Sequence, residues 1–405
     1  MATSRLARVA KRSWKVVLAL VVGIGLGLVL PVGMSLCNST RPGDPFVLSA
    51  EVPPAGSAFD PAFFQTLGAR FEGGHAITML DNGRVFDALI EDIGRARSSI
   101  HIAMYIWEAG AASSRVSAAL IARAKAGVSC RLLIDAFGSS DFEDTVAPEL
   151  VRAGCEVRMF RPLPGAAPLS RNHRKMIVID GAIAMTGGFG VRDNWLGDGV
   201  ANEGWRDTNV RFTGPAVRDA QQAFAENWQE AGGALLPAST FPEPSRDGSV
   251  RAAFVASTAA AVVTRAERLT QLVMAAATRR LWIVNAYFAP SKPILDLIKR
   301  KAASGVDVRL LVPGRKSDSK PALAKAHTYY DSLRAAGVQL WEYQPSMIHS
   351  KTMLADDQLV VIGTINLDPL SLNKLDDAAL VIEDATVASE LARAFVADCV
   401  HARRL

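Results

Sequence analysis

Cysteine and histidine are scarce in this chain. Its 405 residues include four cysteines and six histidines, and no two cysteines form a C-x-x-C pair. The sequence therefore gives little support to zinc binding or to thioredoxin-type chemistry. No other group of side chains has metal-ligand spacing, so we expect neither a metal nor another cofactor. Cys130 and Cys155 stand beside predicted strands, and we interpret both as ordinary buried thiols.

The body of the protein carries no excess of charge. Five cations and no acid lie within the first fifteen residues, and the other 40 lysines and arginines are balanced by 40 aspartates and glutamates. A neutral body has no general attraction for a polyanion, so we expect no nucleic-acid partner. Apolar residues make up 49% of the chain and charged residues 21%, which is typical of a protein with a sizeable core.

One long uncharged run extends from residue 16 to residue 36. A run of this length can cross the ~30 Å hydrocarbon core of a bilayer as a helix. It has no polar stripe, unlike a buried amphipathic helix, and its end resembles neither a clean cleavage site nor a lipoprotein box. We predict an uncleaved anchor, with a cleaved signal peptide as the alternative. The basic flank predicts a cytoplasmic N-terminus, with the rest of the chain outside the cytoplasm.

The sequence contains two similar halves. Strand-like Ser99–Trp107 and Val128–Asp135 have counterparts in Leu281–Phe288 and Val306–Pro313, and helix-like segments lie between them. An internal duplication explains this arrangement. It predicts an α/β fold of two tandem domains, each with a mixed, mostly parallel sheet flanked by helices. The expected organisation is a basic N-terminus and membrane anchor at 1–40, a linker at 41–74, a first domain at 75–232, a second linker at 233–250 and a second domain at 251–405.

Two of the six histidines begin the same pattern, H-x-K-x4-D, at positions 176 residues apart. The residues after each lysine are apolar, which predicts a strand, and histidine and lysine then share one face of it. Imidazole can attack phosphorus or carry a proton, and an ammonium group attracts phosphoryl oxygens. The predicted catalytic residues are His173, Lys175, Asp180, His349, Lys351 and Asp356.

A second element follows each histidine by 14 residues, beginning at Gly187 and at Gly363. Small residues there let backbone N–H groups approach a phosphate, and an asparagine can donate to a phosphoryl oxygen. An acid returns further on in each half, and a carboxylate against a histidine fixes its tautomer and stabilises its cation. We predict substrate binding by Gly187, Gly188, Thr364 and Asn366, and histidine orientation by Asp207 and Asp377.

With these paired motifs the chain resembles the two-motif members of the phospholipase D superfamily. Over residues 75–400 it is most similar to the bacterial cardiolipin synthases. The resemblance implies two α/β halves related by a pseudo-twofold axis, here after one transmembrane helix, with both motifs in one cleft. It also implies a covalent phosphohistidine at His173, a general acid at His349 and no metal. The strings that carry the closer similarity are Asn285-Ala-Tyr-Phe-Ala-Pro290, Val312-Pro-Gly-Arg-Lys-Ser-Asp318, Ala326-His-Thr-Tyr-Tyr330, Tyr343–Lys351 and Trp205–Pro215.

Some residues depart from the family pattern. Gly190 stands where the family usually has asparagine, and Leu375 and Asp377 stand where it usually has asparagine and glutamate. The chain also has one N-terminal apolar run where many relatives have two. These departures bear on the acceptor alcohol more than on membership of the superfamily.

The resemblance implies a membrane enzyme that moves a phosphatidyl group through phosphohistidine. A cardiolipin synthase-like phosphatidyltransferase is the first hypothesis, and a phospholipase D that hydrolyses head groups is the alternative, because only the second nucleophile differs. The neutral body and the anchor oppose a phosphodiesterase nuclease, and the intact motifs oppose a non-catalytic scaffold. The expected partner is a phospholipid in the membrane, and no obligate protein partner is inferred.

Overall fold

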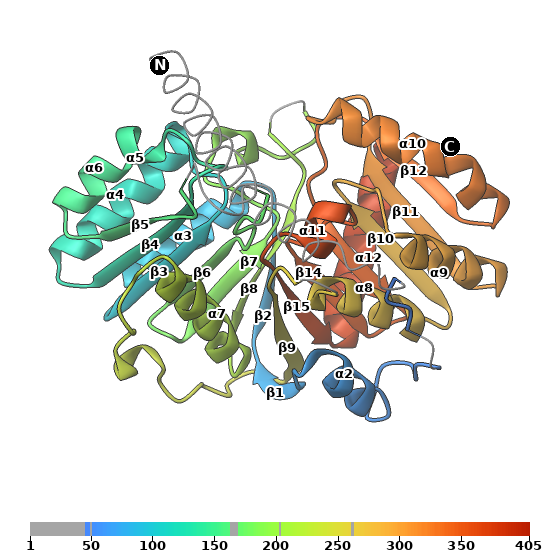
Figure 1. Cartoon of the computed structure of the whole chain (residues 1–405), viewed down its shortest axis with the longest axis horizontal. Coiled ribbons are helices and arrows are strands. Elements are labelled where there is room, and N and C mark those ends of the chain that lie inside the picture. Colours follow the sequence, from blue (N-terminus) through green and yellow to red (C-terminus); the bar gives the residue numbers. More distant parts are fainter. Residues whose placement is uncertain (1–44, 49–50, 163–168, 202–203, 261–262) are drawn as a thin grey trace, which may run out of the picture. The chain divides into compact units, whose positions relative to one another are not determined.

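The computed structural model describes residues 45–405 except 49–50, 163–168, 202–203 and 261–262. The predicted membrane anchor at 1–40 lies outside the described residues. Among the helices that are described, none has both the length and the hydrophobicity to cross a bilayer. Residues 45–405 form one compact unit with two mixed sheets (Figure 1).

The first sheet has seven strands. Three of them, β3, β4 and β5, run parallel, and the remaining pairs are antiparallel. Helices α3 (Arg84–Arg95), α4 (Ala111–Lys125) and α6 (Ala147–Arg152) share a core with one face, and α7 (Ala216–Glu230) shares a core with the other. The strand order is β2 (Ile77–Asp81), β8 (Thr208–Thr213), β7 (Ile183–Gly187), β6 (Met176–Ile179), β3 (Ser99–Met104), β4 (Ser129–Asp135) and β5 (Glu156–Phe160).

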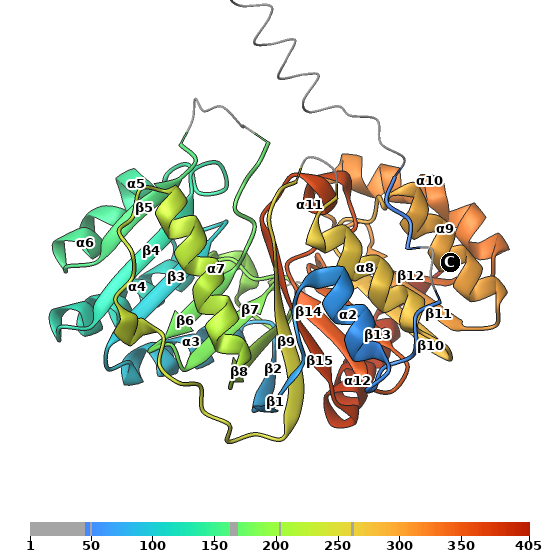
Figure 2. The ribbon, with the colours of Figure 1, turned by 60° about the horizontal axis from the view of Figure 1, so that its bottom comes forward.

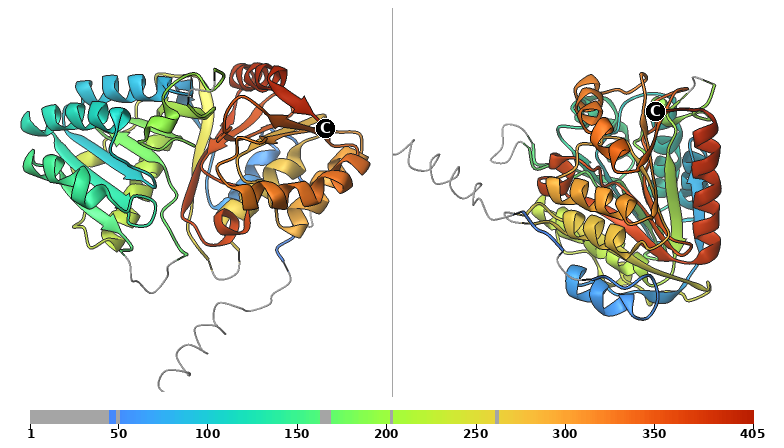
Figure 3. Two further views of the ribbon diagram at one scale, coloured as in Figure 1. Left: turned by 90° about the horizontal axis from the view of Figure 1, so that it is seen from above. Right: turned by 90° about the vertical axis from the view of Figure 1, so that its right-hand side faces the viewer.

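The second sheet has nine strands and repeats this plan. Helices α8 (Arg265–Ala276), α9 (Lys292–Ala303) and α10 (Lys320–Ala335) cover one face, and α12 (Ala385–Val400) covers the opposite face (Figure 3). The strand order is β1 (Glu72–His75), β9 (Val250–Ser257), β15 (Asp377–Glu383), β14 (Leu359–Gly363), β13 (Lys351–Ala355), β10 (Arg280–Asn285), β11 (Asp307–Pro313), β12 (Gln339–Tyr343) and β16 (Ala402–Arg404).

The prediction of mostly parallel sheets was wrong. In the second sheet only β10, β11 and β12 run parallel, and the other pairs are antiparallel. Parallel neighbours need a long crossover, and helices supply it only between β3, β4 and β5 and between β10, β11 and β12. The strand after each motif instead folds back through a tight turn, as β6–β7 and β13–β14, and antiparallel hairpins result.

Alternation along the strands explains why each sheet is covered on both faces. In β3, Ile100, Ile102 and Met104 pack under α3 and α4, whereas Ala103 belongs to the core under α7. That second core is shared by the two halves, since Phe212 of β8 stacks on Phe254 of β9 with ring centroids 6.1 Å apart. The two repeats therefore meet through a continuous apolar core.

The segment before the first repeat packs on the second half. Helix α2 (Phe59–Leu67) contributes Phe59 and Phe63 to the core that contains α8, and β1 pairs with β9 (Figure 2). Only a linker was predicted at 41–74, and neither α2 nor β1 was expected. Apolar spacing in a nine-residue helix with a proline near its start is too short to be distinctive.

Cys130 and Cys155 form a disulfide. The interpretation of both as free thiols was wrong. Cys130 lies in β4 and Cys155 immediately precedes β5, and these strands are parallel neighbours. Strand pairing brings the two side chains together, although their separation of 25 positions conceals this in the sequence.

Candidate active site

Each motif histidine is held by the opposite half of the molecule. His173 N donates to the carbonyl of Asp376 at 2.8 Å, and His349 N donates to the carbonyl of Arg206 at 2.7 Å. Short parallel bridges at these points join the segment before each motif to the segment that carries the other half's acid. Backbone pairing between the halves therefore fixes the positions of both histidines.

Two buried arginines strengthen this junction. Arg174, between His173 and Lys175, donates to the side chains of Asn227 at 2.6 Å and Thr258 at 2.9 Å. Arg206 pairs with Asp398 at 2.7 Å and Asp81 at 2.9 Å. Buried guanidinium groups need such partners, because an unpaired charge away from water is costly.

The two histidines face one cavity of about 430 Å³. Its lining combines the cation of Lys175 with aromatic, apolar and acidic side chains from both halves. Besides the histidines and Lys175, its walls include Tyr105, Ile106, Arg192, Trp205, Tyr287, Asp318, Asn366, Asp368, Leu370 and Leu375.

His173 is oriented by Asp377, a residue of the other half. Its Nδ1 lies 2.8 Å from Oδ1 of Asp377, so Nδ1–H donates to the carboxylate and leaves Nε2 without a proton. Thr364 donates to the same carboxylate oxygen at 2.5 Å. The shorter acid at this position therefore reaches the histidine, and Thr364 holds the acid.

His349 is oriented differently. Its Nδ1 lies 2.9 Å from the carbonyl of Gly188 and 3.4 Å from Oδ2 of Asp207. Asp207 is itself held by Trp195, whose Nε1 donates at 2.8 Å. Lys351 Nζ also lies 2.8 Å from Nδ1 of His349. With its proton on Nδ1 the ring donates to the carbonyl of Gly188, and Nε2 has no hydrogen-bond partner among the described residues. Each acid thus orients the histidine of the opposite repeat.

The two motif lysines lie beside their histidines. Lys175 Nζ donates to the carbonyl of His173 at 3.0 Å, and Lys351 Nζ donates to the carbonyl of His349 at 2.5 Å. Burial, followed by repulsion from Lys351, lowers the pKa of Lys175. Burial lowers the pKa of Lys351 to about 8. Lys175 lines the cavity, and Lys351 lies directly behind His349, so both ammonium groups favour an anion bound between the histidines.

Both imidazoles are neutral at pH 7. Burial, then the charge of Lys175, lowers the pKa of His173 to about 4, and Asp377 opposes this shift. Burial, then Lys351, lowers the pKa of His349 to about 4 against the effect of Asp207. Burial alone would raise the pKa values of Asp207 and Asp377, but their histidine partners lower them. Both acids are therefore ionised at neutral pH.

The structure does not bring Asp180 and Asp356 to the cleft. Asp180 follows β6 and accepts from the amides of Arg97, Ser98 and Ser99 at 2.7–2.9 Å. Asp356 follows β13 and accepts from the amides of residues 278–280 at 2.7–3.1 Å. Their assignment as catalytic residues is corrected, because each lies at the far end of its strand and fixes the turn before a neighbouring strand.

The four predicted substrate-binding residues divide into two groups. Asn366 lines the cavity. Gly188 instead lies against the acid and the histidine, and a Cβ atom there would be 2.4 Å from the carboxylate of Asp207 and 2.7 Å from the carbonyl of His349. Gly187 packs on Asn209, and Thr364 holds Asp377. These three support the oriented histidines and do not line the cavity.

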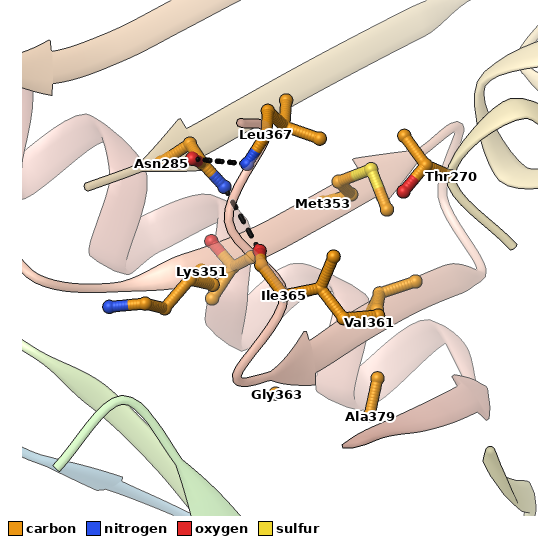
Figure 4. A pocket seen from close by; sticks show the side chains of 10 residues that line it. Thr270, Asn285, Lys351, Met353, Val361, Gly363, Ile365, Leu367 and Ala379 are labelled. Atoms are coloured by element: carbon orange, nitrogen blue, oxygen red, sulfur yellow. Dashed lines mark hydrogen bonds between the residues drawn. The ribbon is translucent and has the colours of Figure 1, made fainter. Parts of the chain in front are cut away.

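The loop with Asn366 is positioned by Asn285, which ends β10. Asn285 Oδ1 accepts from the amide of Leu367 at 2.9 Å, and its Nδ2 donates to the carbonyl of Ile365 at 3.2 Å. Figure 4 shows this clamp, with Lys351 extending away from the apolar side chains of Met353 and Val361. Asn285 lies in one of the strings that resemble the family, but its role in holding this loop was not predicted.

Gly190 is explained by aromatic packing. A Cβ atom at this position would lie 3.0 Å from Ile106 and 3.1 Å from the ring of Trp195. The rings of Trp195 and Trp205 each lie 5.2 Å from that of His349. Gly190 and Asn366 occupy equivalent positions in the two repeats. Trp195 packs against Gly190 in the first half, so the two halves of the cleft are not equivalent.

Two neutral histidines, each with a lysine beside it, define a class of site. It suits transfer of a phosphoryl-type group, in which one imidazole attacks phosphorus and the other supplies a proton. The fold and the site are those of a two-motif phospholipase D-type protein.

Comparison with known sequences agrees with this class. A family model described as cardiolipin synthase, PLD-like domain, matches residues 89–228 and 271–399. Cardiolipin synthase 1 of Bacillus anthracis is 31% identical over 355 residues, which cover 83% of this chain and 70% of that protein. The major cardiolipin synthase of Bacillus subtilis is 31% identical over 346 residues, covering 83% and 71%. The chain belongs to the cardiolipin synthase family of PLD-like proteins.

Solved structures share the fold. Phosphatidylserine synthase of Haemophilus influenzae matches with a TM-score of 0.67 and 13% identity, over 85% of this chain and 92% of that chain. Polyphosphate kinase of Porphyromonas gingivalis matches with a TM-score of 0.55 and 13% identity, over 90% and 52%. At these identities the similarity establishes the fold alone, and the reaction must be argued from the residues of the site.

Proposed function

We propose that this protein is a phosphatidyltransferase of the cardiolipin synthase kind, acting on phospholipids through a phosphohistidine. The observation that carries the proposal is the convergence of His173, Lys175 and His349 on one cavity, with the Nε2 atom of each histidine left free. Family membership specifies the phosphatidyl group, and the cavity combines apolar residues such as Leu370 and Leu375 with the cation that a phosphodiester requires.

In the proposed first step, Nε2 of His173 attacks the phosphorus of a phosphatidylglycerol. The bond to the head-group oxygen breaks, and His349 protonates the departing glycerol. Lys175, Lys351 and Asn366 stabilise the charge that develops on the phosphoryl oxygens. In the second step the hydroxyl of another phosphatidylglycerol attacks, its proton passes to His349, and the P–N bond breaks to release cardiolipin.

The assignment of nucleophile and acid follows the surroundings of each ring. Asp377 lies 2.8 Å from His173 and balances the positive charge that a phosphoimidazole carries. The tryptophan rings beside His349 favour its imidazolium form through cation–π attraction. Binding of the substrate anion between the lysines offsets their repulsion, which raises the pKa of His349 and allows it to carry a proton.

The proposed location is the cell membrane, through the N-terminal anchor, with residues 45–405 outside the cytoplasm. The disulfide between Cys130 and Cys155 supports this side, because disulfides persist in oxidising compartments. A C-terminal alkaline phosphatase fusion should be active, and a C-terminal green fluorescent protein fusion should be dark. A bright fluorescent fusion with a silent phosphatase would overturn the orientation and leave the chemistry intact.

Labelled phosphatidylglycerol in vesicles tests the function. The purified full chain should convert it into cardiolipin and free glycerol, separated by thin-layer chromatography and identified by mass. The double variant His173→Ala, His349→Ala is the control for contaminating enzymes. Phosphatidic acid as the sole lipid product would replace the transferase by a hydrolase.

A further inference from the structure

Among the residues that line the cavity, only those of the second half include carboxylates. Tyr287 follows β10, and its ring lies 5.9 Å from that of His349. Its hydroxyl donates to the carboxylate of Asp318, whose oxygens lie 2.8 and 3.0 Å away. Asp368 lines the same cavity; its Oδ1 accepts from the amides of Leu370 and Ser371 at 2.8 and 3.0 Å, and its Oδ2 is left for a ligand. Two carboxylates and a phenol therefore stand on the His349 side.

The equivalent position in the first half is built differently. Tyr105 lies 5.1 Å from His173, but the nearby carboxylate of Asp135 is turned into its own loop. There it accepts from the amides of Phe137, Gly138 and Asn172 at 2.9–3.1 Å. The acidic wall is thus confined to the side of the histidine that exchanges protons with the alcohol.

A buried acceptor points to a ligand in the same place. Asn366 is 3% exposed and lines the cavity, yet its Oδ1 has no hydrogen-bond partner among the described residues. The Asn285 clamp fixes the neighbouring backbone, and the amide of Asn366 donates to Ser371 at 3.1 Å. An unpaired buried acceptor is costly, and a hydroxyl donor in the cavity would satisfy it.

We propose that Tyr287, Asp318, Asp368 and Asn366 form a polyol subsite, which holds the alcohol that leaves and the alcohol that arrives. Its ligand class is a glyceryl-type head group with two or more hydroxyls, which donate to the carboxylates and to Asn366. This inference rests on the proposed function, and it explains why the acceptor is a polyol and not water. A site built around a polyol holds it in place beside phosphohistidine, whereas water gains no comparable orientation.

The subsite acts on the second step. The bound hydroxyl oxygen forms a bond to phosphorus while the bond between phosphorus and Nε2 of His173 breaks, and the electron pair returns to the imidazole. The hydroxyl proton passes to His349. If the polyol is held poorly, water takes its place and phosphatidic acid forms. The ratio of transfer to hydrolysis therefore reports the subsite separately from the rate of the first step.

The test measures that ratio with labelled phosphatidylglycerol at a fixed concentration of added glycerol. Asp318→Asn, Asp368→Asn and Tyr287→Phe should each lower it, by about tenfold for Asp318→Asn, since a lost hydrogen bond to a charged group is worth ~1.5 kcal/mol. Formation of the covalent intermediate should change much less. Asp331→Asn on exposed α10 is the control and should not alter the ratio.

An unchanged ratio in all three variants, with turnover lowered or not, would overturn the subsite. A wild-type protein that forms only phosphatidic acid would refute the transferase proposal. In that case added glycerol should still inhibit hydrolysis, and the inhibition constant should rise in Asp318→Asn. An equal constant in wild type and variant would refute the subsite as well.

Discussion

The two halves of this protein share a plan and differ where chemistry requires it. Both present histidine and lysine ahead of an antiparallel hairpin, and each receives its histidine-orienting acid from the other half. Around His173 lie the carboxylate of Asp377 and the ring of Tyr105. Around His349 there are two tryptophans, a tyrosine–carboxylate pair and a backbone carbonyl. This difference is the basis of the proposed division into a nucleophile side and a proton-transfer side.

Removing either histidine should have the largest effect. His173→Ala and His349→Ala should each abolish measurable turnover, because nucleophile and acid are separate groups with no substitute in the described cleft. The loss of a general acid alone costs about 10²–10⁴-fold in rate. Turnover of labelled lipid is the measurement, with circular dichroism to verify folding. Near-normal activity in either variant would show that one histidine suffices and would end the division of labour.

Replacing the orienting acids should separate the two sides. Asp377→Asn should lower kcat by roughly 10³-fold, and Asp207→Asn by roughly 10-fold to 100-fold. The difference is expected because His349 retains the carbonyl of Gly188 as a partner, whereas His173 has only Asp377 at its Nδ1. Equal losses would mean that the carbonyl contributes nothing to orientation.

The high-pH limb of activity should depend on Lys351. Burial lowers its pKa to about 8, so its charge is present below that pH and lost above it. The value of kcat/KM should therefore fall as pH rises through about 8. Lys351→Arg should keep its charge throughout, and its lower activity should show no such limb. A wild-type profile that is flat to pH 10 would contradict the requirement for this cation.

The disulfide offers a comparison that concerns stability alone. By position in the repeat, Cys130 and Cys155 correspond to the buried residues Val308 and Val338. Reduction should lower the unfolding temperature of the wild type, since such a crosslink contributes ~3 kcal/mol. The double variant Cys130→Val, Cys155→Val should retain activity, and its unfolding temperature should not change when reductant is added. A wild-type melting curve unaffected by reductant, together with two titratable thiols, would exclude the bond.

Much of the architecture could be predicted because it is repeated. The spacing of glycines, strands and motifs indicated two α/β halves, and the residue types indicated histidines, lysines and acids of the site. The distribution of the acids could not be predicted, because the exchange between Asp377 and His173 depends on a contact across 204 positions. The pattern of residues along the chain indicates local secondary structure, but it does not indicate which distant residues come into contact.

The errors at Asp180 and Asp356 had a signal that could have been used. Asp180 lies seven positions after His173, and a strand rises about 3.3 Å per residue. The two side chains must therefore lie roughly 20 Å apart if the segment is extended. Each Asp has a positive φ, 54° and 53°, as expected of a turn residue. The aspartate of the motif is thus structural in both halves.

Mapping the covalent intermediate tests the division of labour most directly. The wild type and His349→Ala are mixed with labelled phosphatidylglycerol, quenched within one turnover, digested and analysed by mass spectrometry under neutral conditions. We predict a phosphatidyl adduct on the peptide that contains His173 in both proteins, with accumulation in His349→Ala, and none on the peptide that contains His349. An adduct on His349, or turnover without an adduct on either histidine, would contradict the account.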